Sequence, residues 1–399
     1  MILALLLSAW TIQATDVAAL ERMVAAKPAD ARSRRVLADA YLGAGRPMDA
    51  VTELLKATTL APREPGGWYA LGQAYNGVKQ DALATFGGPS DAPWRQLLSA
   101  DALLANSHLT DAFAAYQAAV DRLPSMVNIH DSVAQIYERT GHVAWALRER
   151  AKGRLTNQAC AERRALCEFR AGRYRAALAA AFTASDAESR YWRARGANEL
   201  ALAAFKRLDV LPDSAERRGV RATRAYAEER YTDAVTELKA ALTFAPREAE
   251  LIYQLARAYY SARDFGLAIT TLSPLLEAHP GNLRLLSLKG HSLLQLRQSE
   301  EAVPILQQVV ERDPADASAR LALGRAYLQT GNPAKAVALI EAELANDDDG
   351  SLHVQLARAY TALGQREKAA QLLARSDEIQ RAARERAATA AARTITPPR

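Results

Sequence analysis

Prolines at a fixed spacing constrain the fold of this chain more than any other feature of its sequence. The spacing from Pro28 to Pro62 is 34 residues, and the same interval separates Pro246 from Pro280 and Pro280 from Pro314. Each proline follows a run rich in Ala and Leu. Proline ends helices because it lacks an N–H donor and its ring clashes with the preceding turn. A fixed period of this length therefore predicts helical units that stack on one another.

Within each unit the same kinds of residue return at the same offsets. Small residues allow two helices to cross closely, while large apolar residues fill the space between neighbouring units. Because one helical hairpin cannot bury its apolar face alone, the units are expected to stack. The matching positions of the last four units are Leu255, Ala256, Tyr259, Ala268 and Leu272; Gly290, Leu293, Ala302 and Leu306; Leu323, Gly324, Tyr327, Ala336 and Ile340; and Leu356, Ala357, Tyr360, Ala369 and Leu373.

These positions resemble the tetratricopeptide-repeat (TPR) family, whose signature is W-x2-L-G-x2-Y, then A-x3-F and P, with a period of about 34 residues. The segment from Trp68 to Tyr75, WYALGQAY, matches the first half of that signature. The resemblance covers residues 16–376. It implies an all-α fold, a right-handed TPR superhelix (α-solenoid) of about nine to ten helical hairpins, some of them degenerate.

Two parts of the chain depart from the repeat. After Tyr75 the second helix is expected to be irregular, and the sequence GGPSDAP at 87–93 must break it. Between 157 and 214 a short hairpin around Gly172 precedes a long Ala-rich run that begins near Trp192. The segments that begin at Trp68 and Trp192 look alike, as if a longer helix replaced a normal pair in each half of the chain.

The pattern divides the chain into five parts. We expect a signal peptide at 1–14, an N-terminal TPR array at 15–158, degenerate or irregular helical repeats at 159–214, a C-terminal TPR array at 215–376, and a capping helix with a frayed tail at 377–399. A charged, Ala-rich helix suits the polar outer face of a terminal repeat.

The acidic run at 347–349 falls where other repeats turn, so it predicts a turn and a helix N-cap. A calcium loop would alternate its ligands along the sequence.

The N-terminal segment MILALLLSAW is apolar but shorter than the about 20 residues that a transmembrane helix needs. A small residue, Ala14, follows it and predicts signal-peptide cleavage after that residue. The protein is therefore expected to be periplasmic or secreted. No Lys or Arg precedes the apolar run, and without export the chain would be a cytoplasmic protein with a buried first helix.

The chain has two cysteines, Cys160 and Cys167. On one continuous helix their Cα atoms would lie about 10 Å apart, which exceeds the limit of about 7 Å for a disulfide. They can pair only if Cys160 lies in a turn before the helix, and an oxidising compartment would favour the bond. The histidines are scattered without ligand spacing, so neither a metal nor a cofactor is expected.

The sequence predicts a non-enzymatic protein. It contains no Walker loop, no G-x-G-x-x-G, no H-E-x-x-H and no paired C-x-x-C. A net charge of +6 over 399 residues is modest, so no nucleic-acid partner is expected. We expect a scaffold that binds a partner protein or an extended peptide, whether in the periplasm or as a cytoplasmic TPR adaptor. The alternative is a glycan- or nucleotide-binding accessory of a cell-envelope enzyme, which would need stacking by Trp68, Trp94 or Trp192.

The resemblance also predicts where a partner would bind. In the TPR family the first helix of each hairpin lines a concave groove, so the residue after each small packing position is expected to face it. In the C-terminal array these residues are Arg257, His291, Arg325 and Arg358, at spacings of 34, 34 and 33. Guanidinium groups repeated along a groove suit an acidic or carboxylate-bearing peptide, because each can form a bidentate ion pair. The alternative is a merely solvated face.

Mass spectrometry of the natively expressed protein tests the two expectations that concern export. We predict a mature chain that begins after Ala14. If the chain is exported, a disulfide between Cys160 and Cys167 becomes possible, because the compartment is oxidising. An intact Met1 in a cytosolic fraction would contradict export. Two free thiols in the denatured, unreduced protein would exclude a bond between Cys160 and Cys167.

Overall fold

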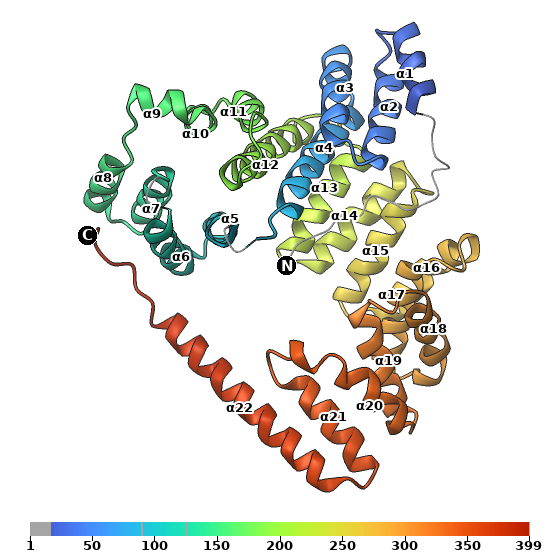
Figure 1. The fold of residues 1–399 in the computed structure, drawn as a ribbon. Helices are drawn as coiled ribbons and strands as arrows, with labels where there is room; N and C mark the ends of the chain where they lie inside the picture. Colours follow the sequence, from blue (N-terminus) through green and yellow to red (C-terminus); the bar gives the residue numbers. More distant parts are fainter. Residues whose placement is uncertain (1–16, 89–90, 124–125, 399) are drawn as a thin grey trace. The chain divides into compact units, whose positions relative to one another are not determined.

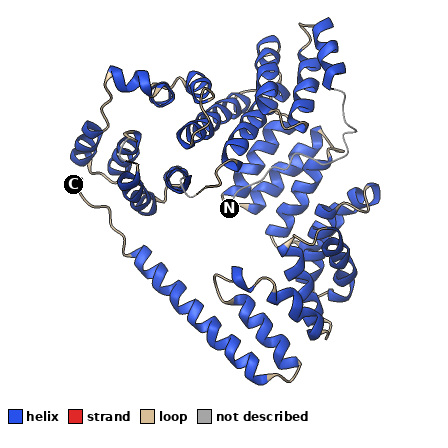
Figure 2. Ribbon diagram, viewed as in Figure 1, coloured by secondary structure: helices blue, strands red, loops and turns tan. Residues whose placement is uncertain are grey.

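The computed structural model describes residues 17–88, 91–123 and 126–398. In these residues the regular structure is helical throughout and includes no strand (Figures 1 and 2). The predicted all-α class is therefore confirmed. The predicted signal peptide, 1–14, lies outside the described residues. Within the described parts of the chain, no helix combines the length and the apolar character that a membrane span requires.

The chain forms two compact units, one of residues 1–212 with 392–399 and one of residues 213–391. The helices of the first unit are α1 (Val17–Ala26), α2 (Ala31–Gly43), α3 (Pro47–Leu60), α4 (Pro65–Ala84), α5 (Ala92–Ala105), α6 (Leu109–Arg122), α7 (Asn128–Arg139), α8 (Val143–Lys152), α9 (Asn157–Glu162), α10 (Arg164–Arg170), α11 (Tyr174–Ala181) and α12 (Ala187–Asp209). Those of the second unit are α13 (Ala215–Ala227), α14 (Tyr231–Phe244), α15 (Ala249–Ser261), α16 (Phe265–Ala278), α17 (Leu283–Gln295), α18 (Ser299–Arg312), α19 (Ala317–Gln329), α20 (Pro333–Glu341), the short 3₁₀ helix η2 (Leu344–Asn346), α21 (Ser351–Ala362) and α22 (Arg366–Ala391).

Most of these helices pack in pairs, as a helical-repeat fold requires. The pairs of the first unit are α2 with α3, α4 with α12, α5 with α6, α7 with α8, and α10 with α11. Those of the second unit are α13 with α14, α15 with α16, α17 with α18, α19 with α20, and α21 with α22. The pairs found in the described residues agree with the predicted solenoid of helical hairpins.

The repeated prolines act as the sequence predicts. Helices end two residues before each of them, at Ala26, Leu60, Phe244, Ala278 and Arg312. The reason is steric, because the proline ring disfavours helical dihedral angles at the residue that precedes it. The chain therefore turns at the same place in each repeat.

The small residues of the repeat lie where the two helices of a pair cross. A Cβ atom added at Gly290 would lie 2.6 Å from Cδ2 of Leu306, and one added at Gly324 would lie 3.0 Å from Cγ1 of Ile340. Leu306 and Ile340 are fully buried on the partner helix. One predicted packing residue, Leu373, is instead 46% exposed, because α22 is the last helix of its unit and no further pair stacks on it.

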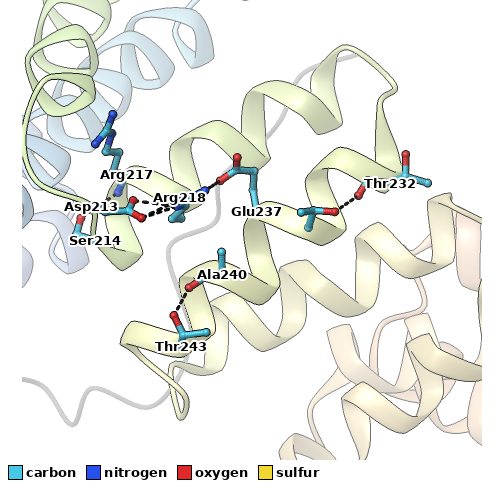
Figure 3. Close-up of polar contacts among 9 residues, drawn as sticks. Asp213, Ser214, Arg217, Arg218, Thr232, Glu237, Ala240 and Thr243 are labelled. Atoms are coloured by element: carbon cyan, nitrogen blue, oxygen red, sulfur yellow. Dashed lines mark hydrogen bonds and ion pairs between the residues drawn. The ribbon is translucent and has the colours of Figure 1, made fainter.

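An Arg–Glu ion pair links the two helices of several pairs. In Figure 3 the guanidinium of Arg218, on α13, lies between two carboxylates. Its Nε donates to Oδ1 of Asp213 at 2.8 Å, and its Nη1 donates to Oε2 of Glu237 on α14 at 3.0 Å. The bond from Arg218 holds the pKa of Asp213 below its usual value. Arg34 makes the equivalent ion pair with Glu53 on α3, and Arg320 pairs with Glu343 in the turn that follows α20.

The residue six positions after a repeat proline, where Arg34 and Arg320 lie, also bonds to the carbonyl of that proline. Trp68 donates from Nε1 to the carbonyl of Pro62 at 3.0 Å, and Arg34 donates from Nε to the carbonyl of Pro28 at 3.0 Å. Arg320 bonds to the carbonyl of Pro314 in the same way. A planar N–H donor at this position therefore ties the start of one helix to the turn before it, and either Trp or Arg can supply it.

The two long helices α4 and α12 pack against each other, although residues 85–186 separate them in the chain (Figure 1). A Cβ atom at Gly72 would overlap the ring of Phe205. Lys79 donates to Oδ1 of Asn198 at 3.2 Å. We expected a separate, irregular second helix after Tyr75. The residues that follow Tyr75 instead continue α4 to Ala84. The partner of α4 is α12, and α5–α11 form an excursion between the two.

Cys160 and Cys167 are joined by a disulfide, with their Cα atoms 5.5 Å apart. The sequence predicted that the bond would require Cys160 to lie in a turn. Cys160 instead lies in the short helix α9. The chain breaks at Arg163, whose φ of −122° and ψ of 57° are not helical. That break, between α9 and α10, brings the two cysteines closer than one continuous helix would allow.

The C-terminal part differs from the prediction in two ways. The helix α22 is a single element of 26 residues, so the second helix of the last pair and the expected cap are continuous. The tail was expected to fray, yet residues 392–399 belong to the first compact unit. There Tyr137 donates its hydroxyl to the carbonyl of Thr396 at 2.7 Å. The sequence pattern carries no information about this contact, so it could not be predicted.

The acidic run at 347–349 forms the expected turn and cap. Oδ1 of Asp349 accepts from the backbone N–H of Ser351 at 2.9 Å, at the start of α21. Oδ2 of Asp347 accepts from the backbone N–H of His353 at 2.9 Å. Gly350 has a φ of +78°, a left-handed conformation that glycine adopts without steric cost. Both carboxylates are therefore used to satisfy helix N–H groups.

The glycine crossings lead to a prediction about stability. We expect Gly324→Leu to destabilise the protein by about 1–3 kcal/mol or more, because the new side chain must enter the space of a buried isoleucine. The matched change is Gly266→Ala on α16, where an added Cβ meets nothing within 4 Å. It should be neutral or slightly stabilising. Urea unfolding followed by circular dichroism at 222 nm measures both, and equal effects would contradict the crossing role of Gly324.

Candidate functional site

The structure places the four predicted groove residues on the first helices of successive pairs. Arg257 lies on α15, His291 on α17, Arg325 on α19 and Arg358 on α21. The side chains nevertheless divide into two groups, because only two of them reach a common hollow.

Arg325 and Arg358 line the same pocket of the second unit, and Arg297 from the turn after α17 completes it. The pocket has a volume of about 640 Å³. It is lined by Arg297, Arg325, Leu328, Gln329, Gly331, Pro333, Gln355, Arg358 and Ala362. A smaller adjoining hollow shares Arg297, Arg325, Gln329 and Arg358, and adds Leu294 and Gln295. We call these three arginines and the two hollows the arginine pocket.

The three guanidinium groups of the arginine pocket lack a carboxylate partner among the described residues, as the ion pairs of the chain show. In contrast, Arg218 and Arg320 in the same unit are both paired with glutamate. No acidic residue lines either hollow. Positive charge is therefore concentrated there without local neutralisation, which attracts anions.

Two glutamines add polar groups to the arginine pocket. Oε1 of Gln355 is buried and has no hydrogen-bond partner among the described residues. Oε1 of Gln329 accepts a hydrogen bond from Oγ of Ser299, which orients the amide. The amide N–H groups of both side chains can donate to a ligand. The pocket thus combines charged donors with neutral ones beside an apolar wall of Leu328, Pro333 and Ala362.

Arg257 does not reach this pocket. Its guanidinium lies 5.1 Å from the ring centroid of Tyr226 and 5.9 Å from that of Tyr253. The guanidinium of Arg284 also lies over the Tyr253 ring, 4.2 Å from its centroid. Arg257 is therefore held by aromatic rings further along the unit, where cation–π attraction fixes its position.

His291 is also engaged locally. Its Nδ1 lies 2.8 Å from the carbonyl oxygen of Ser287, and its Nε2 lies 3.2 Å from Oγ of Ser318. Burial lowers the pKa of His291 below its ordinary value, and the nearby charge of Arg325 lowers it further. A lowered pKa favours the neutral imidazole, so His291 adds little to the positive charge of the arginine pocket.

Arg297 was missed by sequence reasoning, which considered only residues within helices. It lies in the turn between α17 and α18 and has a φ of +64°. The equivalent turn position 34 residues later is Gly331, which has a φ of +73° and lies in the next repeat. The sequence contains no specific signal for it, because Arg263 occupies the equivalent turn 34 residues earlier and does not line the pocket.

The tryptophans of the alternative hypothesis are buried or bonded within the fold. Trp192 is 1% exposed and Trp94 is 9% exposed, so both rings belong to the core. Trp68 is half-buried and bonded to the Pro62 carbonyl. The arginine pocket itself has no aromatic lining residue.

Stacked pairs of helices with small residues at their crossings define a helical-repeat interaction scaffold. Three family models described as tetratricopeptide repeat match the sequence. One matches residues 16–65, 35–86 and 287–351, another matches 225–291, and a third matches 351–381. These matches together span more than half of the chain. The chain belongs to the tetratricopeptide-repeat family.

Solved structures of other proteins are similar to parts of this chain. MamA from Desulfovibrio magneticus RS-1 is 24% identical, with a TM-score of 0.40, over 43% of this chain and 97% of that one. A thermophilic TPR protein of Thermus thermophilus is 24% identical, with a TM-score of 0.35, over 44% of this chain and 98% of that one. No curated protein sequence matches this chain significantly.

The lowered pKa of His291 predicts a pH dependence of stability. The unfolded chain binds a proton at this residue near its ordinary pKa of 6.5, whereas the folded chain binds it only at lower pH. The free energy of unfolding should therefore fall as the pH falls below 6.5. We expect wild type to be favoured over His291→Gln more strongly at pH 7.5 than at pH 5.5 in urea unfolding. A difference between the two proteins that does not change with pH would contradict this interpretation.

Proposed function

We propose that this protein is a non-enzymatic scaffold whose second unit binds an acidic, extended segment of a partner protein at the arginine pocket. The observation that carries this proposal is the convergence of Arg297, Arg325 and Arg358 on one hollow that contains no carboxylate. An acidic segment would supply the missing negative charge.

The chemistry of the lining favours a carboxylate ligand. A guanidinium presents a rigid fork of N–H donors that matches the two oxygens of a carboxylate. A charge-assisted hydrogen bond contributes about 1.5–3 kcal/mol when it is partly desolvated. Arg358 is exposed and Arg325 is half-buried, so Arg325 should contribute more than Arg358. The apolar wall can cover the methylene groups of a glutamate side chain.

A protein or peptide fits this pocket better than a glycan or a nucleotide. Sugar and base recognition uses stacking on aromatic faces, whereas the lining here is guanidinium, amide and aliphatic. The TPR family supports the same choice, because its repeats are typical of non-enzymatic scaffolds that bind other proteins. The second candidate function, a glycan- or nucleotide-binding accessory, is less favoured because no aromatic residue lines this pocket for a sugar or base to stack on.

We also propose that the protein functions outside the cytoplasm. The disulfide between Cys160 and Cys167 supports this, because such bonds persist in oxidising compartments and are rare in the cytosol of most organisms. The apolar N-terminal sequence is consistent with that location.

A labelled hexaglutamate peptide tests the arginine pocket directly. We expect it to bind the full chain, and to bind more weakly when NaCl rises from about 50 to about 300 mM, because exposed charges are screened. The double substitution Arg325→Ala and Arg358→Ala should weaken binding at least tenfold, which corresponds to about 1.4 kcal/mol. Helicity and thermal melting should stay nearly unchanged. Fluorescence anisotropy measures binding, and wild-type affinity in the double variant would refute the proposal.

The turn residues offer a matched control for net charge. Arg297 and Arg263 occupy equivalent turns 34 residues apart, with φ values of +64° and +68°. Replacing either with glycine removes one positive charge and releases a left-handed strain of about 1 kcal/mol. Only Arg297 lines the pocket, so Arg297→Gly should weaken hexaglutamate binding while Arg263→Gly should not. Equal losses would show that the peptide responds to net charge alone.

A further inference from the structure

The C-terminal segment of the chain, residues 393–398, has the form of a bound peptide. It follows the last helical residue, Ala391, and contains no helix or turn of its own. Pro397 and Pro398 lack N–H donors and favour extended backbone. The segment belongs to the first compact unit, where it contacts α6 and α7.

Three contacts of different kinds hold this segment. Arg393 donates from Nη1 to Oδ1 of Asp111, near the start of α6, at 3.3 Å. Ile395 packs against the main apolar cluster of the first unit. The carbonyl of Thr396 accepts a hydrogen bond of 2.7 Å from the Tyr137 hydroxyl on α7. A charged contact, an apolar contact and a backbone contact follow one another along one extended stretch of chain.

The surface that receives the segment is rigid. Tyr137 is 0% exposed, yet its hydroxyl reaches the tail. Its ring centroid lies 5.7 Å from that of Phe113 and 5.6 Å from that of Trp145. Aromatic neighbours therefore fix the hydroxyl in place, and binding a ligand carries no cost for ordering it.

The contacts of residues 393–398 with α6 and α7 resemble those of a bound ligand, because most of the segment stays exposed to solvent. Ile395 and Pro398 are half-buried, while the residues Arg393, Thr394, Thr396 and Pro397 are exposed. The hydrogen bond uses a backbone carbonyl, which any residue at that position would offer. Both side chains of the Arg393–Asp111 pair are largely solvated, at 48% and 41% exposure. A segment held in this way can leave without exposing a large apolar surface.

We propose that the α6–α7 surface is a binding site for an extended segment in which a basic residue is followed by isoleucine, threonine and two prolines, and that residues 393–398 occupy it as an internal ligand. A partner with a segment of this chemistry would have to displace the tail. The tail competes at an effective concentration of about a millimolar, as expected for a tethered ligand. This site lies in the first unit and is independent of the arginine pocket.

A competition experiment tests the proposal. The probe is a fluorescein-labelled peptide of residues 393–398, RTITPP, with an amidated C-terminus. The proteins are the full chain and a chain that ends at Ala391. The peptide should bind the shortened chain at least tenfold more tightly than the full chain, because the tail no longer blocks the site. Fluorescence anisotropy measures both affinities.

Two altered peptides distinguish recognition from unspecific adhesion. Ile395→Asp in the peptide should weaken binding to the shortened chain at least tenfold, because it places a charge against the apolar cluster. Thr394→Ala alters an exposed residue and should leave the affinity unchanged. In the shortened chain, Tyr137→Phe keeps the buried ring but removes the hydroxyl donor, and it should weaken binding by a few-fold.

Three results would overturn the proposal. The peptide could bind the full and the shortened chain with the same affinity, or the Ile395→Asp peptide could bind as tightly as the unaltered one. The third is that the peptide does not bind the shortened chain even at millimolar concentration. Circular dichroism of the shortened chain shows whether it keeps its helices. If it does not, the full chain with Ile395→Asp takes its place, and it should bind the unaltered peptide more tightly than wild type does.

Discussion

The structure depends on the close crossing of two helices at a residue with little or no side chain. Gly72, Gly290 and Gly324 each lie where a Cβ would meet a large apolar side chain of the partner helix. Without this approach, the large residues could not interdigitate, and the two helices would bury less apolar surface. The stacking of the pairs follows from this close approach, while the prolines separately set where each helix ends.

The charges of the chain show how a repeat can serve both structure and binding. Arg34, Arg218 and Arg320 are paired with a glutamate of the partner helix or of the turn that follows it. Paired in this way, they tie helices together and offer little free charge. Arg325 and Arg358 line a hollow that contains no acidic residue. The same residue type therefore has two roles, which depend on whether a neighbouring segment supplies a carboxylate.

Much of the fold could be predicted from the sequence because the repeat is local. The proline period, the small crossing residues and the helix ends all depend on contacts within one or two units. The pairing of α4 with α12 could not be predicted, because it joins segments more than a hundred residues apart and leaves no periodic signal. For the pocket, the register predicted Arg325 and Arg358 as groove residues. It did not reveal Arg297, which lies in a turn, or the neutral His291, whose pKa depends on burial.

The pairing of α4 with α12 also has a consequence for the order of folding. Most pairs in the chain close across a short turn, whereas this one must bring together ends separated by residues 85–186. By chain-entropy arguments, closing a connection of that length instead of a short turn costs about 3 kcal/mol. During synthesis on the ribosome, α4 emerges long before α12. The apolar face of α4 therefore stays unpaired until α12 has been made. Among the helix pairs, the slow, non-local closure is therefore expected at α4 with α12, while the repeats of the second unit can form as they emerge.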